Sequence, residues 1–387
     1  MKPFSSLVRH PGNASLFRAA EMSILATREG YPFHLHAEGV RGTGKTTILR
    51  AARALLPPIE RVRGCLYNCS PRAPHCPAHR DLSRRELDTL GTEYVPMPFL
   101  EVSPSAKVGT VAGSIDLARI VDPSRPQAAL LPGTIPQAHR GILFVDEVNR
   151  LADIAPELAD VLLDVMGTRP GRIQVEETGV PRVEMAVCVS VWAASNPDEE
   201  PGPLEEIRRQ LSDRFDLVVP VRRPGRRELV EQILSLCDPW AEPSQVAGAQ
   251  NRGAAPLASA LALLPAAQPP SPLPEEGVLA RVLLPPELRV LIASLYVEFG
   301  LESLRAVEAL QVGSRLAAAL AGREAVALED LLFVAPLVLE HRVEPQTLPR
   351  VLRFLEAWRE EQAADRGPAA AGGGAPGRGA GAARGAQ

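Results

Sequence analysis

The segment at residues 39–46, GVRGTGKT, constrains this chain more than any other. It fits the pattern G-x-x-x-x-G-K-[ST], in which a glycine-rich turn wraps its backbone N–H groups around phosphate groups. The pattern requires a strand before the turn and a helix that begins within it. Lysine is rare in this sequence, since Lys2, Lys45 and Lys107 are its only examples. A lysine kept here among many arginines indicates a need for a compact positive charge, as a bound phosphate requires.

The segments on either side of this loop supply the strand and the helix. Residues 33–37 read as a short strand that runs into the loop, and residues 46–55 read as a helix that a Pro-Pro pair then stops. Ahead of the strand, residues 14–29 carry apolar side chains near helical spacing, and Asn13 stands where a helix cap is expected. The sequence therefore predicts a helix, a strand, the loop and a second helix, in that order.

Three later apolar runs have the character of buried parallel strands. Residues 141–145 are continuously apolar and end in an Asp-Glu pair, and residues 186–194 run into Ser-Asn-Pro. Residues 215–221 form the third run. Strands that alternate with helices predict an α/β fold with a parallel sheet, whose ligands bind at the carboxyl ends of the strands.

The loop and the Asp-Glu pair together specify a Mg²⁺-dependent nucleotide site. Lys45 is expected to reach the β- and γ-phosphates of ATP, and the Thr46 hydroxyl to bind Mg²⁺. Asp146 is expected to hold Mg²⁺ through water, and Glu147 to polarise the attacking water as a general base. Taken separately, the loop could be an ordinary turn and the acidic pair a solvated strand end. The residues predicted to contact ATP are Gly39, Val40, Arg41, Gly42, Thr43, Gly44, Lys45, Thr46 and Thr47.

Two polar residues near later strands are candidates to complete the site. Asn196 could orient the water beside the γ-phosphate, although Asn-Pro is also a common way to start a turn. Arg214 stands just before the run at 215–221, and a guanidinium supplied in trans can stabilise a transferring phosphoryl group. The alternatives for Arg214 are a surface ion pair with an adjacent aspartate, or replacement in its role by Arg208 or Arg209.

Changes in composition and in the spacing of apolar residues divide the chain into four parts. Residues 1–236 form the α/β domain, which includes a cysteine-rich loop at 64–80. Residues 237–284 are rich in proline and alanine and read as a linker that is disordered in part. Residues 285–364 predict a small all-helical domain, and residues 365–387 a disordered low-complexity tail. The apolar runs of the helical domain are residues 288–299, 304–320, 328–341 and 348–362.

Three of the five cysteines crowd into the loop at 64–80. Their pattern, C-x3-C-x6-C-x2-H, offers four soft ligands between proline breakers and suits a tetrahedral Zn²⁺ ion. An iron–sulfur cluster is a second option, His75 is an alternative fourth ligand, and unliganded thiols in a surface loop are the alternative to any metal. Cys188, within the run at 186–194, reads as a core thiol. The candidate ligands are Cys65, Cys69, Cys76 and His79.

On these residues the sequence resembles the AAA+ ATPases, and within them the ATPase (I) subunit of magnesium chelatase and its relatives. Residues 141–152, GILFVDEVNRLA, are similar to the Walker B region of that family, and residues 132–140 resemble the segment before it. The other stretches that resemble the family are residues 108–116 (its GTID insertion, with looser glycine spacing), 210–216 (its arginine-finger segment), 303–306 (its sensor-2 position) and 319–326 (its ALEGR stretch).

The resemblance covers about residues 10–235 and 285–345. It implies an AAA+ module with a helical lid that assembles as a ring, usually a hexamer, with ATP bound between subunits. Arg214 would then reach into the neighbour's site, and Arg305 would touch the nucleotide from the lid. The resemblance also implies a partner with a von Willebrand A domain. A separate catalytic subunit would insert a metal ion into a tetrapyrrole, unless the chain serves a related maturation system.

Composition bears on location and on rival functions. The net charge is −4 with no strongly basic domain, so neither nucleic acid nor an anionic membrane is the expected partner. No apolar run approaches the roughly 20 residues that span a bilayer. The N-terminus lacks the apolar core of a signal peptide, so we expect a cytoplasmic protein.

Two other function classes share parts of this pattern. A DNA-translocating AAA+ motor is one, because replicative helicases carry a segment similar to residues 212–216. The mixed charges of a possible β-hairpin around residues 171–184 argue against it. A nucleotide-binding adaptor without turnover is the other, and the presence of Lys45, Asp146 and Glu147 argues against that one.

Overall fold

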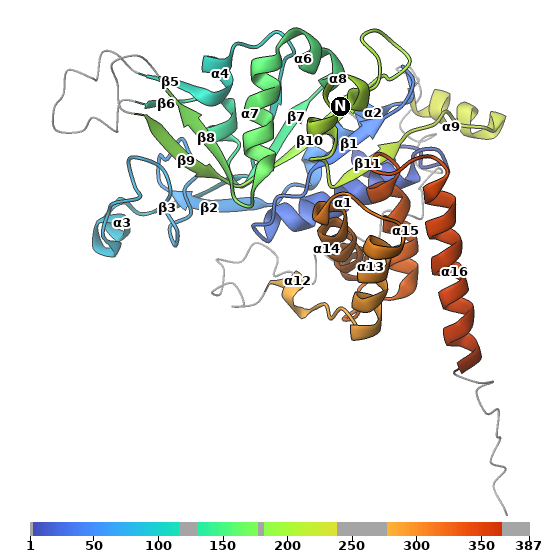
Figure 1. Ribbon diagram of the computed structural model, residues 1–387. Coiled ribbons are helices and arrows are strands. Elements are labelled where there is room, and N and C mark those ends of the chain that lie inside the picture. The colour runs from blue at the N-terminus through green and yellow to red at the C-terminus, as the bar shows by residue number, and fades with distance from the viewer. Residues whose placement is uncertain (1–2, 116–129, 177–181, 238–276, 366–387) are drawn as a thin grey trace, which may run out of the picture.

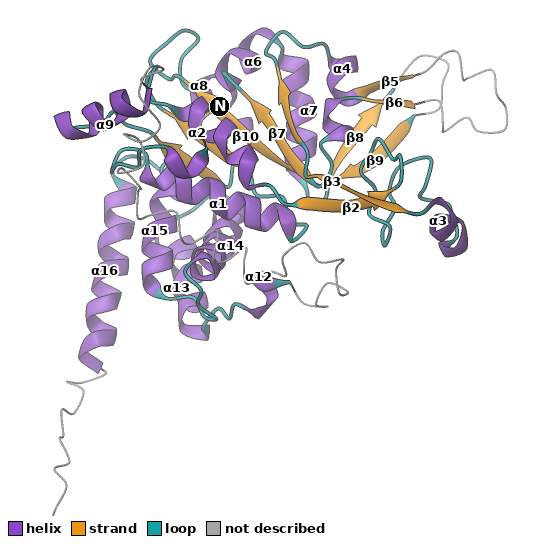
Figure 2. Cartoon of the chain, turned by 180° about the vertical axis from the view of Figure 1, so that it is seen from behind, coloured by secondary structure: helices purple, strands orange, loops and turns teal. Residues whose placement is uncertain are grey.

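The structure is a computed structural model of the 387-residue chain, and it describes residues 3–115, 130–176, 182–237 and 277–365 (Figure 1). These residues form an α/β part and a bundle of helices beside it, as Figure 2 shows from behind. Most of the predicted linker and nearly all of the predicted tail lie outside the described residues. Helix α12 (Val278–Arg281) begins within the range that the sequence assigned to the linker.

A five-stranded sheet, in which every neighbouring pair is parallel, forms the centre of the α/β part. Its strand order is β11-β1-β10-β7-β4, which confirms the predicted parallel sheet. In the middle of the sheet Trp192 lies opposite both Leu35 and Phe144, so the phosphate-loop strand and the acidic strand flank β10. The strands are β1 (Leu35–Glu38), β4 (Phe99–Val102), β7 (Gly141–Val145), β10 (Val189–Ser195) and β11 (Leu217–Pro220).

Side chains alternate between the two faces of the sheet, and each face has its own core. Ile142 and Phe144 pack with α1 (Ala14–Arg28), α2 (Lys45–Ala51) and the helices of residues 278–365, which form the lid. Leu143 and Val145 pack into the opposite core. The helices of that opposite core include α6 (Val148–Ile154), α7 (Pro156–Gly167) and α8 (Leu204–Ser212).

Smaller elements decorate this sheet. Three antiparallel two-stranded sheets pair β2 (Pro58–Val62) with β3 (Thr92–Pro96), β5 (Gly113–Ile115) with β6 (Leu130–Pro132), and β8 (Gly171–Val175) with β9 (Val183–Val187). The short helices are η1 (Phe4–Ser6), η2 (Ala52–Leu55), α3 (Arg84–Leu90), α4 (Val108–Ala112), α5 (Thr134–Gln137) and α9 (Arg227–Cys237).

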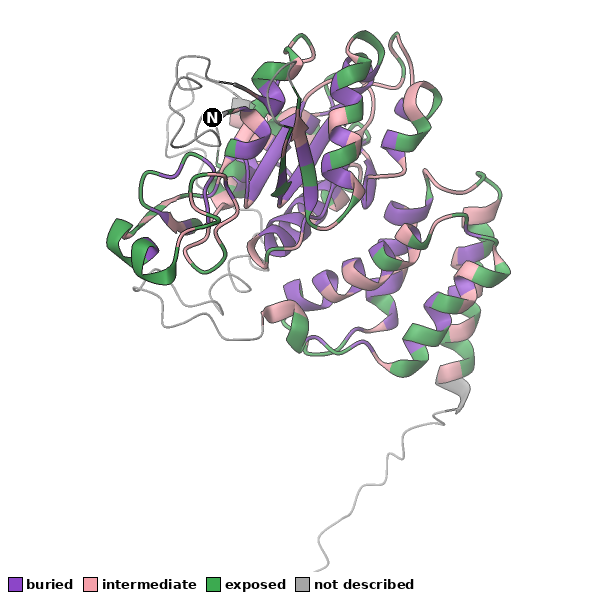
Figure 3. Cartoon of the chain, turned by 60° about the vertical axis from the view of Figure 1, so that its left-hand side comes forward, coloured by how far each residue is buried: buried purple, intermediate pink, exposed green. Residues whose placement is uncertain are grey.

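The lid packs on α1, which lies between the sheet and the lid helices in both ribbon views (Figures 1 and 2). Purple buried stripes face inward along these helices and green exposed faces point outward (Figure 3). Such stripes are the signature of amphipathic helices and confirm the predicted helical domain. Besides α12, the lid helices are α13 (Pro286–Glu298), α14 (Leu304–Leu320), α15 (Leu328–Leu339) and α16 (Thr347–Asp365).

Two local predictions were wrong. The run at 186–194 is not one strand, because it breaks at Cys188 into the end of β9 and the start of β10. Cys188 therefore lies between two strands, where its thiol donates to the Gly30 carbonyl oxygen at 3.1 Å, and it is only half-buried rather than a core residue. Asn13 precedes α1, but its side chain caps no helical N–H and instead bonds the backbone of Val8 and His10.

A buried arginine of the lid fastens it to the α/β part. The Arg342 side chain is 5% exposed and follows α15. Its Nε donates to Asp213 Oδ1 at 3.1 Å, and its Nη2 donates to the carbonyl oxygens of Asp213 and Phe215 at 2.8 and 2.7 Å. These two residues flank Arg214. The lid thus holds the backbone on both sides of the predicted arginine finger.

We expect Arg342→Ala to lower the free energy of unfolding by about 2–4 kcal/mol, because it removes a buried guanidinium that bonds a half-buried carboxylate and two carbonyl oxygens. Urea denaturation measures the change. Arg353→Ala is the control, since that arginine is exposed and makes one local bond to the Pro349 carbonyl. It should stay within about 0.5 kcal/mol of the parent. An equal loss of unfolding free energy in the two variants would show that the bonds of Arg342 do not fasten the lid.

Candidate functional site

The phosphate loop connects the end of β1 to the start of α2. A Cβ on Gly39 would come within 2.2 Å of the Val221 carbonyl oxygen, so only glycine fits where β1 meets the chain after β11. Gly44 has φ of 85°, the left-handed region that glycine tolerates, and it sets the direction of the first turn of α2. The glycines of the motif are therefore required by the backbone path.

Lys45 joins this loop to the next strand. Its ammonium donates to the carbonyl oxygens of Gly39 at 2.5 Å and Val40 at 2.9 Å, and to Asn196 Oδ1 at 2.9 Å. Burial lowers the pKa of Lys45, and the charges of nearby carboxylates, first Asp198 and then Asp146, oppose that shift. Asn196 follows β10, so the structure brings this predicted residue directly to the predicted lysine.

The two predicted Mg²⁺ ligands also meet. Thr46 Oγ1 donates to Asp146 Oδ1 at 3.2 Å, which places a hydroxyl and a carboxylate, both hard oxygen donors, side by side. Such donors suit Mg²⁺, which binds proteins through one or two oxygens and keeps several waters. Glu147 follows Asp146 with φ of 53°, and its Oε2 pairs with Arg150 at 2.9 Å.

These side chains surround one cavity of about 250 Å³. Gly39, Val40 and Thr43 of the loop are not part of its lining, because they close the loop behind Lys45. The lining residues are Arg41, Gly42, Gly44, Lys45, Thr46, Thr47, Asp146, Glu147, Ala194, Ser195 and Asn196.

Three residues around this cavity were missed in the sequence. Ser195 is buried at the end of β10 and its Oγ lies 2.8 Å from His36 Nε2. Burial, reinforced by the charge of Lys45, lowers the pKa of His36 to about 3, so this histidine is neutral. Arg50 forms a two-pronged bond to Glu101 and reaches Asp146 Oδ2 at 3.4 Å. The position of Ser195, one residue before Asn196, is the only local signal that pointed to any of them.

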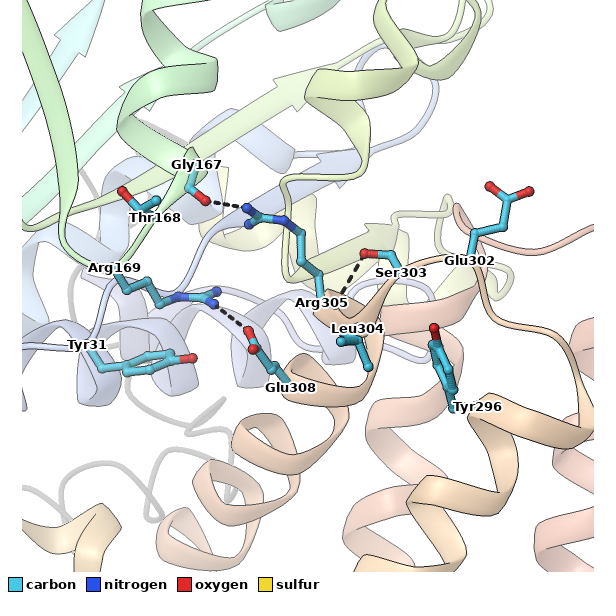
Figure 4. A pocket seen from close by; sticks show the side chains of 10 residues that line it. All are labelled: Tyr31, Gly167, Thr168, Arg169, Tyr296, Glu302, Ser303, Leu304, Arg305 and Glu308. Atoms are coloured by element: carbon cyan, nitrogen blue, oxygen red, sulfur yellow. Dashed lines mark hydrogen bonds and ion pairs between the residues drawn. The ribbon is translucent and has the colours of Figure 1, made fainter.

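Arg214 and Arg305 lie elsewhere. Arg214 Nη1 donates to the Gly167 carbonyl oxygen at 3.2 Å, and Arg305 Nη1 donates to the Met166 carbonyl oxygen at 3.3 Å. Arg305 also donates to the Gly167 carbonyl oxygen (Figure 4). Arg305 also lines a second cavity, of about 760 Å³, between the end of α7 and the start of α14. Arg305 therefore does not line the phosphate-loop cavity of its own chain, and its contact with a nucleotide stays a prediction. The lid packs on α1, which directs the start of α14 to the end of α7.

The cysteine-rich loop occupies another part of the domain, between β2 and α3. The candidate ligand atoms of Cys65, Cys69, Cys76 and His79 all lie within 4.8 Å of one another. The ring of His75, in the same loop, stacks on His139 with ring centres 3.7 Å apart. His139 lies just before β7 begins, whereas Asp146 follows the end of that strand. The cysteine loop and the phosphate site are therefore at opposite edges of the sheet.

The chain is similar to known proteins along most of its length. The sequence model of the AAA lid domain matches residues 289–353. The magnesium-chelatase 38 kDa subunit of Acidiphilium rubrum is 34% identical over 352 residues, which cover 90% of this chain and 93% of that protein. A structure of the complex between the BchI and BchD subunits of magnesium chelatase contains a chain with 26% identity and a TM-score of 0.44, covering 90% of this chain and 98% of its own. A crystal structure from Cytophaga hutchinsonii has 15% identity and a TM-score of 0.51, covering 92% and 91%.

A phosphate-loop domain with an AAA lid beside it is an AAA+ ATPase, a class that uses ATP with Mg²⁺. The identity to the Acidiphilium rubrum protein extends over nearly all of both chains. The chain belongs to the family of the magnesium-chelatase 38 kDa, or ChlI, subunits. Among the helices that the structure describes, none is long and apolar enough to cross a membrane.

Glu38, at the end of β1, gives the site a pH dependence. Burial, together with the charges of Glu205 and Glu340, raises the pKa of Glu38 from 4.5 to about 7, while the charge of Lys45 opposes that shift. Within the described residues, Glu38 Oε1 has no hydrogen-bond partner. A pKa raised in the folded state favours the folded protein most at low pH, and that advantage is lost as the pH rises through about 7.

We therefore expect the free energy of unfolding of the nucleotide-free protein to fall by ~2 kcal/mol between about pH 5 and pH 8, after allowance for partial exposure of this carboxyl. Glu38→Gln should remove most of that fall, because the amide does not ionise. The same replacement at the exposed Glu287 should leave it intact. Urea titrations at both pH values measure the difference. If the free energy of unfolding of Glu38→Gln falls as much between the two pH values as that of the parent, the assignment to Glu38 is contradicted.

Proposed function

We propose that this chain is a Mg-ATP-hydrolysing ring motor of the magnesium-chelatase I-subunit type. One observation carries the proposal: Lys45, Thr46, Asp146, Glu147 and Asn196, drawn from the ends of three neighbouring strands, line a single cavity. Phosphate binding, metal binding and activation of water each have a candidate there. A nucleotide-binding adaptor would need the first two but not Glu147.

Each residue then has a distinct role. Lys45 exchanges its bonds to loop carbonyls for bonds to the β- and γ-phosphates, and Asn196 is freed to orient the attacking water. Thr46 and Asp146 hold Mg²⁺, which neutralises phosphate charge when bound. Glu147, at the rim of the cavity, takes the proton from the water.

Arg214 and Arg305 are assigned to the site of a neighbouring subunit. Both bond the Gly167 carbonyl, outside the cavity of their own chain. Burial lowers the pKa of Arg305, and the positive charges of Arg214 and Arg169 add to that shift. Among the described residues neither Arg214 nor Arg305 makes an ion pair, whereas Arg169 pairs with Asp216. A cluster of unpaired guanidinium groups is suited to the γ-phosphate of a nucleotide bound next door.

The motion of the ring would be passed to a partner. The relatives are named as subunits of magnesium chelatase, which supports a partner subunit with a von Willebrand A domain. The work done would be metal insertion into a tetrapyrrole by a catalytic subunit, or maturation of a related metalloprotein or complex. We assign this assembly to the cytoplasm, as a hexamer, with ATP and Mg²⁺ as its cofactors. A Zn²⁺ ion in the cysteine loop would stand outside the reaction.

DNA translocation receives less support. The β8–β9 hairpin, where a DNA-binding motor would present basic side chains, pairs its own charges instead. Arg172 lies 3.7 Å from Glu184, and Arg182 lies 3.4 Å from Glu176. A hairpin with internally paired charges has little attraction for a phosphate backbone.

Glu147→Gln should lower the turnover of ATP about 10²–10⁴-fold while nucleotide affinity is retained, because it removes the base and no phosphate contact. Turnover and fluorescent-nucleotide binding measure the two effects, and sedimentation should find the ATP-bound ring trapped. Glu157→Gln, an exposed acid on α7, is the control. Unchanged turnover in Glu147→Gln would remove this residue from its role.

Mixing inactive subunits tests the role of Arg214. Arg214→Ala and Lys45→Ala should each lose about 10³-fold or more in turnover. When the two are mixed, some interfaces join an intact Lys45 site to an intact Arg214 from its neighbour, so activity should return. Arg209→Ala, at an exposed arginine paired with Glu302, should stay active alone. If no mixture recovers activity, Arg214 does not act between subunits.

A further inference from the structure

We propose that one Zn²⁺ ion is bound in a closed site by Cys65, Cys69, Cys76 and His79. The ion would fasten strands β2 and β3, and the loop between them, to the amino-terminal edge of the sheet. Neither the family relationship nor the ATPase chemistry assigns a ligand to this loop. The site is independent of ATP hydrolysis, because it lies across the sheet from the phosphate loop.

The spacing of the donor atoms fits a single tetrahedral ion. Zinc bonds of about 2.3 Å to sulfur and about 2.0 Å to nitrogen put neighbouring donors about 3.5–3.8 Å apart. The four donors here lie within 4.8 Å of one another, and Cys76 Sγ is 3.2 Å from His79 Nδ1. A small contraction of the loop is enough to close the shell. Four donors gathered this tightly surround one ion, which disfavours a larger iron–sulfur cluster.

The surroundings of the sulfurs suit thiolates that bind a metal. Cys65, Cys69 and Cys76 are at most 2% exposed and lie in a hydrophobic core, where a free thiolate would be costly. The backbone N–H groups of His75 and Cys76 donate to Cys69 Sγ at 3.4 and 3.3 Å. Such outer bonds orient metal-ligating sulfur and offset its charge. Three sulfurs and one imidazole are the donor set that selects Zn²⁺ for a structural site.

Geometry also chooses between the two histidines of the loop. The Nδ1 atom of His75 lies 3.3 Å from Cys69 Sγ, but His75 is not among the four mutually close donors. Its ring is stacked on His139. His79 is half-buried at the outer side of the cluster and completes it. His79 is therefore the fourth ligand, and His75 packs the loop onto the domain.

The loop is tied to the rest of the domain at residues between the ligands. Asn68, between Cys65 and Cys69, accepts a bond from Arg61 at 2.8 Å and donates to the Gln137 carbonyl at 2.6 Å. His139, under the stacked ring of His75, accepts a bond from the backbone N–H of Cys188 at 3.0 Å. These contacts join the loop to the chain on the amino-terminal sides of β7 and β10. A bound ion would lock that junction and stabilise the fold.

Metal analysis of the purified full-length chain tests the site. After exhaustive dialysis against EDTA, plasma mass spectrometry should find one Zn²⁺ per chain. Cys65→Ser, Cys69→Ser and His79→Gln should lose it. The matched controls Cys188→Ser and His75→Gln change the same residue types outside the ligand set and should retain it. Replacement by Co²⁺ should give the visible absorption of a tetrahedral ion together with a thiolate-to-cobalt band.

The outcomes separate cleanly. Iron with visible absorption in the native protein would overturn zinc in favour of an iron–sulfur cluster, and no metal with three titratable thiols would overturn any metal site. Should the cysteine variants fail to fold, the native protein's metal content and the faster zinc release of His79→Gln relative to His75→Gln still decide. Retention of zinc by His79→Gln with loss from His75→Gln would overturn the ligand assignment. None of these readouts depends on ATP turnover.

Discussion

Three of the bonds that the Lys45 ammonium donates are the interaction on which the rest of the site depends. They tie the carbonyls of Gly39 and Val40, after β1, to Asn196, after β10. The next residue, Thr46, bonds Asp146 after β7. Since these strands are adjacent and parallel, one side-chain cluster samples the ends of three strands at once. The ammonium of Lys45 bonds only oxygen atoms. Phosphate oxygens can take the place of these partners when a nucleotide binds.

The placement of the lid decides where Arg305 and the backbone on both sides of Arg214 lie. Because the lid covers α1, the start of α14 meets the end of α7, and Arg305 is drawn to the carbonyls of Met166 and Gly167. Arg342 holds the backbone on both sides of Arg214 against the same lid. The lid therefore carries Arg305 itself and bonds the backbone on both sides of Arg214. In the ring proposed above, a displacement of the lid would shift these two guanidinium groups relative to the nucleotide of the adjoining subunit.

Signals that are local in sequence were sufficient for the loop, the acidic strand and the lid helices. The run at 304–320 coincides with α14 because a helix buries a stripe that recurs every few residues. Contacts between distant segments left no such signal. Phe99–Val102 is a four-residue edge strand with little apolar pattern, and the break at Cys188 is hidden in a continuous apolar run. The position of Arg305 depends on how the lid packs, a long-range outcome that a motif does not carry.

The two edges of the sheet separate the chemistry from the scaffold. At the carboxyl edge the backbone ends in polar side chains whose partners must exchange when ATP enters, so this edge has to remain adaptable. The amino edge holds the buried cysteine loop, with His75 stacked on His139 just ahead of β7. The loop thus packs beside the amino end of the strand whose other end carries Asp146 and Glu147. A closed metal site there would stiffen the acidic strand without entering the nucleotide cavity, because five buried residues of β7 separate the two.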